Sequence, residues 1–211
     1  MRAIDDLVAC MKANKEQNGF WADSDGVSVN SHGAHVILDD PDLYYALFDV
    51  LQDSPGTDVS SFVGVIHKVI TGYFGNKVPS EKLRRDVIND ANICLGDFDV
   101  ASSVKNFKGK SCAMCVEHAS ASHNLWLLLG MESAYVESCD RSVPHAFCVV
   151  KIGENKNLLF DTVLGNYLIF ENDPVKIMLD GIPFEVPPAV GVASPGCYAN
   201  ESVMVNDIER Y

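Results

Sequence analysis

The order of the hydrophobic patterns along the chain constrains its fold more than any other feature of the sequence. In the first half, apolar residues recur mostly at the three- and four-residue spacing of amphipathic helices. From about residue 112 we expect a helix rich in small residues that ends near Leu129 and is closed by Gly130. Four strand-like runs then follow one another, at residues 133–138, 146–152, 158–163 and 167–170. This order predicts an α+β fold with an antiparallel sheet.

Turn signals divide the first half into short elements. We expect a helix around residues 4–11, a small hairpin at 27–30 and 35–38, and helices over 43–51, 58–73 and 79–95. Asp40 followed by Pro41 is a favourable start for the helix at 43–51, because Asp caps a helix and Pro suits its first position. Beyond Asp173 the chain is rich in Pro and Gly, which is typical of a segment that wraps around a core.

The charge and the cysteines exclude several classes of partner. The 211 residues include 29 Asp and Glu against 16 Lys and Arg, so a polyanion would be repelled and we expect no nucleic acid. No apolar run reaches the roughly 20 residues that span a bilayer, and the acidic start of the chain does not resemble a signal peptide. We therefore expect no membrane association and a cytoplasmic protein. Seven scattered cysteines fit a reducing compartment, and the sequence leaves the oligomeric state open.

The segment from Gly109 to Ala119, Gly-Lys-Ser-Cys-Ala-Met-Cys-Val-Glu-His-Ala, holds the groups best suited to chemistry. A cysteine acts as a nucleophile through its thiolate, which is scarce at neutral pH unless the surroundings stabilise the anion. The positive end of a helix and a histidine that takes the proton both have this effect. With Ser111 as the expected N-cap, Cys112 and Cys115 would both lie in the first helical turn.

The motifs that follow resemble those of the transglutaminase-like superfamily. In that superfamily the nucleophile opens a helix, with a small residue one turn later and a glycine near the helix end. A strand, then a strand beginning His-Ala-aromatic, and then one ending in Asp-Pro-Thr follow. The matching units here, in the same order, are Cys115, Ala119, Gly130, Ser133-Ala-Tyr-Val136, His145-Ala-Phe147 and Asp161-Thr162. The resemblance covers residues 109–166.

The resemblance implies a papain-like core in which the helix bearing the nucleophile packs on an antiparallel sheet. It implies that Cys115 is the nucleophile, that His145 is the base and that Asp161 orients the histidine. The substrate would be a protein, a peptide or another carboxamide. Within one domain over residues 1–211, we expect a mainly helical part at 1–108, a catalytic core at 109–172 and a wrapping C-terminal segment at 173–211.

Cys112 is the rival nucleophile. Counting from Cys112, the residue one turn later is Val116 rather than a small residue, and Gly130 lies eighteen positions on. Counting from Cys115 gives Ala119 and fifteen positions, which fits the motif better. Cys112 is then either a core residue at the helix start or a second thiol open to reversible oxidation with its neighbour.

The role of His145 depends on the register of the hairpin formed by residues 146–152 and 158–163. His145 and Asp161 must point to the same face, and a shift of one residue would separate them. A four-residue loop would pair Cys148 with Asp161 and place His145 on the opposite face. A three-residue loop at 153–155 pairs Phe147 with Asp161 and sets His145 diagonally from Asp161, within side-chain reach. We predict that loop, or a bulge with the same parity.

The implied reaction is attack of the Cys115 sulfur on an amide carbonyl, after which water or an amine resolves the thioester. The oxyanion that develops needs hydrogen-bond donors. One would be the backbone N–H of Cys115. The Gln or Trp side chain that often supplies the second in relatives is missing just before Cys115; Asn106 is the candidate there, and Trp21 a more distant one. The sequence does not distinguish peptidase, amidase, deamidase and cross-linking activities.

Two other classes of function fit parts of the sequence. Cys112-x-x-Cys115 with His118 and His123 offers zinc-ligand atoms, but all four would lie on one helix, where steps of three residues drift by roughly 60° around the axis. A thioredoxin-like Cys pair needs a preceding strand, and residues 104–110 form a poor one. We therefore predict neither a metal nor a cofactor. The third class is a binding protein that keeps the fold without turnover, which the missing second donor favours.

Overall fold

The computed structural model describes residues 27–29, 35–37, 40–53, 58–75, 81–90, 101–138, 145–173, 175–179, 182–186 and 203–205. Its largest sheet has the strand order β10-β4-β5-β6-β7. The strands are β4 (Ser133–Ser138), β5 (Ala146–Gly153), β6 (Lys156–Asp161), β7 (Asn166–Phe170) and β10 (Val203–Val205). Neighbours among β4 to β7 are antiparallel, whereas β10 pairs in parallel with β4. The predicted α+β class with an antiparallel sheet is confirmed.

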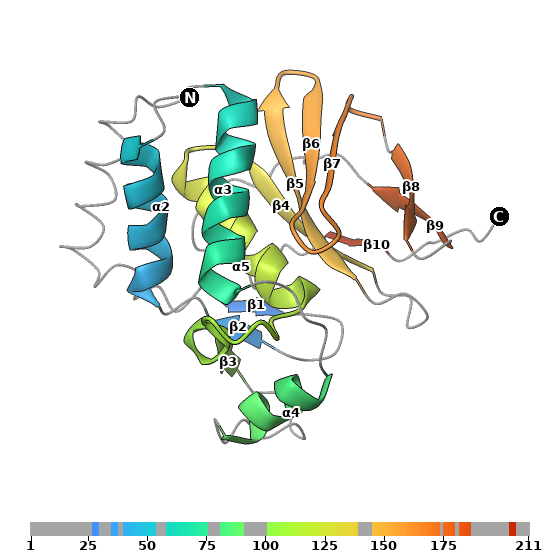
Figure 1. The fold of residues 1–211 in the computed structure, drawn as a ribbon. Helices are drawn as coiled ribbons and strands as arrows, with labels where there is room; N and C mark the ends of the chain where they lie inside the picture. Colours follow the sequence, from blue (N-terminus) through green and yellow to red (C-terminus); the bar gives the residue numbers. More distant parts are fainter. Residues whose placement is uncertain are drawn as a thin grey trace.

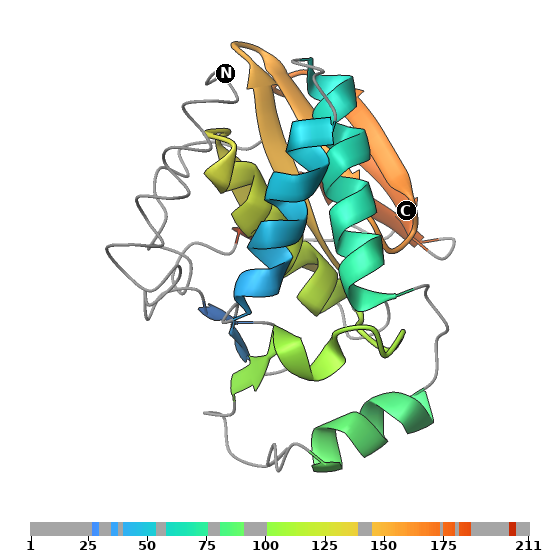
Figure 2. The same cartoon turned by 60° about the vertical axis from the view of Figure 1, so that its left-hand side comes forward.

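Helices α5 (Cys115–Leu128), α3 (Val59–Phe74) and α2 (Pro41–Asp53) stack on one side of this sheet (Figure 1). α5 contacts β4, β5 and β6, α3 packs on α5, and α2 packs on α3. In Figure 2, after rotation, α2 and α3 lie side by side in front, with α5 and the strands behind them. Because α5 is covered on both sides, nearly all of its residues are buried. Its run of small residues, 119–122, lets its neighbours approach closely.

Local sequence explains where α3 begins and ends. Asp58 is its N-cap, and the carboxylate accepts a hydrogen bond from the Ser61 N–H at 2.7 Å. Gly75 is its C-cap, with a φ of 86° that favours glycine. Between the caps one apolar face is buried, formed by Phe62, Val65, Ile66, Val69, Ile70, Tyr73 and Phe74. Burial of this face against α5 and α2 is the main source of the helix's stability.

A smaller sheet lies beside the helices and has the order β1-β2-β3, with β1 at Val27–Val29, β2 at His35–Ile37 and β3 at Ala101–Ser103. β1 and β2 pair antiparallel, which confirms the predicted hairpin. α4 (Glu81–Asp90) and the 3-10 helix η1 (Val104–Phe107) pack against each other next to it. The helix expected at 4–11 lies outside the described residues, as do residues 91–95 of the helix expected at 79–95.

The C-terminal segment contains more regular structure than its Pro and Gly content suggested. β8 (Val175–Leu179) and β9 (Ile182–Val186) form an antiparallel hairpin. β10 then covers the edge of β4 in the main sheet. Among the helices that the structure describes, none is both long enough and apolar enough to cross a membrane.

The helix that bears Cys115 begins later than predicted. Its first residue is Cys115, and its N-cap is Met114 in an extended conformation. Ser111, the expected N-cap, has a φ of 56° and donates its backbone N–H to the Phe74 carbonyl at 2.9 Å, so it belongs to the preceding turn. The prediction that Cys112 lies in the first helical turn is therefore wrong, and the same prediction for Cys115 is confirmed.

Candidate active site

Cys115 is half-buried at the first position of α5, where the helix dipole is positive. It packs against a small apolar cluster of Ala119, Tyr135 and Ala146, so its side chain lies over the start of β5. As the first helical residue, Cys115 has a backbone N–H with no acceptor inside the helix. The sulfur is thus partly accessible and lies at the positive end of a helix. Both conditions are typical of a reactive thiol.

The turn before Cys115 is fixed to the end of α3. The Gly109 N–H donates to the Tyr73 carbonyl at 2.8 Å, and the Ser111 N–H donates to the Phe74 carbonyl at 2.9 Å. A Cβ on Gly75 would lie 2.6 Å from the Ser111 hydroxyl oxygen, so the two segments touch there without room for a side chain. The path of the chain into α5 is thus set by α3.

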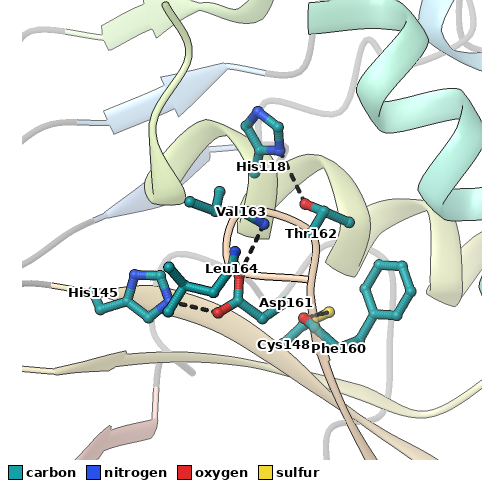
Figure 3. Close-up of polar contacts among 8 residues, drawn as sticks. All are labelled: His118, His145, Cys148, Phe160, Asp161, Thr162, Val163 and Leu164. Carbon is teal, nitrogen blue, oxygen red and sulfur yellow. Dashed lines mark hydrogen bonds and ion pairs between the residues drawn. The ribbon is translucent and has the colours of Figure 1, made fainter. Parts of the chain in front are cut away.

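His145 and Asp161 meet at the open end of the β5–β6 hairpin. His145 Nε2 donates to Asp161 Oδ2 at 2.6 Å, and both side chains are buried (Figure 3). The register pairs Cys148 with Phe160, so Phe147 stands opposite Asp161, as predicted. The predicted three-residue loop is replaced by a two-residue turn at 154–155 and a bulge between Lys151 and Gly153. The alternative that we predicted, a bulge with the same parity, is confirmed.

Asp161 is held independently of His145. Its second oxygen, Oδ1, accepts hydrogen bonds from the N–H groups of Val163 at 2.9 Å and Leu164 at 3.1 Å. Figure 3 shows the carboxylate between this turn and the imidazole. With both oxygens occupied, the carboxylate has one orientation, and Nε2 of His145 is the nitrogen that must carry a proton toward it.

Cys115 is one of the groups that raise the pKa of His145, so its side chain lies close to the imidazole. Nε2 is occupied by Asp161, so Nδ1 is the nitrogen left for the sulfur. Burial lowers the pKa of His145, but the interactions with Asp161 and Cys115 outweigh this effect and raise the pKa to about 9. At neutral pH the imidazole is therefore protonated beside the sulfur.

Two other cysteines in the described residues are poor nucleophiles. Cys112 is buried outside α5, and burial raises the pKa of its thiol against the opposing effect of Arg84. Cys148 is fully buried in β5, donates weakly to the Phe160 carbonyl at 3.5 Å and has a pKa well above its usual range because of burial. The geometry therefore favours Cys115, the cysteine that the motif register selects.

The histidines of α5 have structural partners. His118 Nδ1 is hydrogen-bonded to the Thr162 hydroxyl at 2.9 Å, and its ring stacks on Phe74. His123 Nδ1 is hydrogen-bonded to the Ser133 hydroxyl at 2.9 Å, and burial lowers the pKa of His123 to about 3. Across the described part of the chain, no three His, Cys, Asp or Glu side chains are grouped so that they could hold one metal ion.

An ion pair at the start of α5 was not predicted from the sequence. Both oxygens of the Glu117 carboxylate bind the Arg84 guanidinium, at 2.7 and 2.9 Å, and Oε2 also accepts the N–H of Met114 at 2.8 Å. The side chain of Glu117 is almost completely buried. Its position three residues after Met114 is a capping-box position, and this signal could have been used. Nothing in the sequence connects Glu117 with Arg84.

The two candidates for the second oxyanion donor have different outcomes. Asn106 lies half-buried in η1, whose main contacts are with α4 and β3. Its role stays a prediction. Trp21 lies outside the described residues. The backbone N–H of Cys115, at the start of α5, is where a first donor was expected.

No protein-family model matches this chain, and no curated protein or solved structure is similar enough to it to count as a match. Its chemistry must therefore be inferred from the residues of the site.

Proposed function

We propose that this chain is a thiol acyl-transfer enzyme of the transglutaminase-like superfamily, with a papain-like core and a Cys115–His145–Asp161 site. The observation that carries the proposal is the 2.6 Å hydrogen bond from His145 Nε2 to Asp161, made by an imidazole whose pKa Cys115 also helps to raise. The packing of α5 on antiparallel strands and the order of motifs from Cys115 to Thr162 support the same family.

In the first half-reaction the Cys115 thiolate attacks the carbonyl carbon of a carboxamide or peptide bond. A carbon–sulfur bond forms and the carbonyl electrons move to the oxygen, which becomes an oxyanion. The protonated His145 then gives its proton to the leaving nitrogen, the carbon–nitrogen bond breaks, and a thioester remains. The high pKa of His145 keeps the proton available for this step at neutral pH.

In the second half-reaction water or an amine attacks the thioester. Neutral His145 takes a proton from the incoming nucleophile, the carbon–sulfur bond breaks, and the thiolate is restored. Asp161 keeps the imidazole in the tautomer that presents Nδ1 to the sulfur, because its carboxylate is fixed on both sides. The backbone N–H of Cys115 supplies one donor to the oxyanion, and Asn106 is the candidate for a second.

Trapping of the acyl-enzyme tests the proposal. The protein is incubated with a library of carboxamides and peptides bearing weak leaving amines, and the covalent adduct is located by mass spectrometry. We expect the adduct on Cys115, its loss in C115A, and its loss or strong reduction in H145Q. C112A is the matched control, because Cys112 is a nearby cysteine outside the site, and it should keep the adduct.

An adduct on Cys112, or one on Cys115 that forms equally well in H145Q, would overturn the proposal. Tight non-covalent binding of a peptide with no adduct under any condition would instead support the alternative of a binding protein without turnover.

A further inference from the structure

We propose that Arg84 is a positioning residue for Cys115: it neutralises Glu117, so that the carboxylate can order the start of α5 without opposing the thiolate. This inference rests on the proposed function, because it assigns the electrostatic support of the same nucleophile. Arg84 belongs to α4, and Glu117 belongs to the first turn of α5. The pair joins two elements that lie far apart in the sequence.

Glu117 is needed at this position for a structural reason. Its Oε2 accepts the N–H of Met114 at 2.8 Å and so closes the first turn of α5 around Cys115. The side chain is only 1% exposed, so water cannot screen its charge. An unpaired carboxylate in this place, two residues from the sulfur, would disfavour a second negative charge on Cys115.

The guanidinium of Arg84 supplies the missing positive charge. Nη1 and Nη2 contact the two oxygens of Glu117 at 2.9 and 2.7 Å, a bidentate arrangement. Nη1 also lies 3.4 Å from the Cys112 carbonyl, so Arg84 contacts the chain on both sides of the helix start. Burial lowers the pKa of Arg84, but this is outweighed by effects of which those of Glu117 are the largest, and the pKa is raised.

Arg84 is fixed in place by packing as well as by charge. Its guanidinium lies over the ring of Phe107, 4.9 Å from the centroid, and Phe107 is fully buried in η1. The neighbouring Arg85 is exposed. A single arginine of α4 thus faces the nucleophile, and Arg85 offers a matched control.

The test is the rate of alkylation of Cys115 by iodoacetamide, followed by mass spectrometry across a pH series. Three variants separate charge from shape: R84M leaves Glu117 unpaired, E117Q keeps an oxygen for the Met114 N–H without the charge, and R84M/E117Q removes both charges. We expect R84M to react roughly tenfold more slowly at neutral pH, with its profile displaced to higher pH. E117Q should react at least as fast as the wild type. The double variant should react at a rate close to that of the wild type.

R85M and E132Q are the controls. Arg85 and Glu132 are exposed residues of the same kinds outside the site, and both variants should match the wild type. If R84M does not fold, the comparison of E117Q with R84M/E117Q tests the inference. The double variant must then react more slowly than E117Q, because it has lost the cation that E117Q keeps.

Slower alkylation of Cys115 in both R84M and E117Q would show that the Arg84–Glu117 pair acts only by ordering the structure. This result would overturn the inference. The variant H145Q separates this failure from failure of the proposed function. If R84M and E117Q are alkylated at the wild-type rate while H145Q is alkylated slowly, only the present inference is overturned. Unchanged alkylation in H145Q removes the proposed function, and the inference with it.

Discussion

His145 and Asp161 stand sixteen residues apart in the chain and hydrogen-bond at 2.6 Å across the open end of one hairpin. His145 immediately precedes β5, and Asp161 is the last residue of β6. The second oxygen of Asp161 is held by the N–H groups of Val163 and Leu164. The imidazole is thus oriented by a carboxylate that is itself fixed.

Replacing Asp161 with Asn should impair the site without changing its shape. The amide oxygen can still accept from Val163 and Leu164, which turns the NH₂ group toward Nε2 of His145. The imidazole must then accept at Nε2 and carry its proton on Nδ1, so it can no longer take a proton from Cys115. We expect acyl transfer to fall roughly 10²- to 10⁴-fold, measured as turnover or as formation of the Cys115 adduct.

Asp173 is an exposed acid after β7 and provides the control for this change. D173N should leave the adduct rate unaltered. Equal rates in D161N and D173N would contradict the role of Asp161.

The stability of the fold should depend on pH through His145. Its pKa is about 9 in the folded protein, against an ordinary value of 6.5. The protonated form of His145 is thus stabilised by folding, and this contribution is complete below about pH 6.5. As the pH rises through about 9 it is lost, which lowers the free energy of unfolding by up to about 3 kcal/mol. Urea unfolding of wild type and H145Q, at about pH 6 and about pH 10, measures the difference.

The difference in the free energy of unfolding between wild type and H145Q should be smaller at about pH 10 than at about pH 6. C115A should show a smaller change with pH than the wild type, because Cys115 contributes to the raised pKa of His145. A gap of the same size at both pH values would refute this prediction.

His123 should have the opposite effect, at acid pH. Burial lowers its pKa to about 3 in the folded protein, so between about pH 6.5 and 3 only the unfolded chain takes up the proton. The free energy of unfolding should fall with falling pH, by up to about 5 kcal/mol from this group. H123Q can keep a hydrogen bond to Ser133 and does not titrate there. We expect its urea midpoint to fall less steeply with acid than that of the wild type, and parallel curves would rule this out.

Gly75 should be intolerant of a side chain. Its φ of 86° and ψ of 171° suit glycine, and a Cβ would lie 2.6 Å from the Ser111 hydroxyl oxygen. We expect G75A to lose about 1–3 kcal/mol of stability from backbone strain alone. Displacement of Ser111 should also slow alkylation of Cys115, because Ser111 belongs to the turn that leads into α5. Urea unfolding and the alkylation rate measure the two effects.

Gly72 gives the contrast within the same helix. No atom lies within 4 Å of a Cβ placed there, so G72A should gain up to about 1 kcal/mol in stability. Adding S111G to G75A removes the close contact but not the strain at residue 75, and should restore alkylation. Equal alkylation rates in G75A and G72A would show that contact between residue 75 and Ser111 does not affect Cys115.

The strands of the main sheet could be predicted from sequence because polar or Gly-containing turns bound each apolar run. The four predicted strands agree with β4, β5, β6 and β7 to within two residues at each end. The face shared by His145 and Asp161 was also predictable, since side chains alternate along a strand and the apolar residues must face α5. The loop was not predictable: the chain uses a bulge before Gly153 where a longer turn would preserve the same alternation.

The start of the nucleophile helix was mispredicted because Ser111 is a good N-cap residue that is used elsewhere. Its N–H binds Phe74, a residue of α3, and no local pattern reveals this contact. The pairing of Arg84 with Glu117 is similarly non-local, since the partners are 33 positions apart in the sequence. The order of motifs therefore selected Cys115, His145 and Asp161, whereas the contact between Arg84 and Glu117 emerges only from packing.

The division of the site between a helix and a hairpin has a consequence for folding. His145 and Asp161 come together as soon as β5 pairs with β6, which is a local event. Cys115 joins them only when α5 docks on β5, and it approaches that sheet under α3. On the proposed function, any partly unfolded state in which α5 has lifted away therefore contains a Cys115 thiol without these neighbours. The alkylation rate of Cys115 should then report how completely α5 has docked on the sheet.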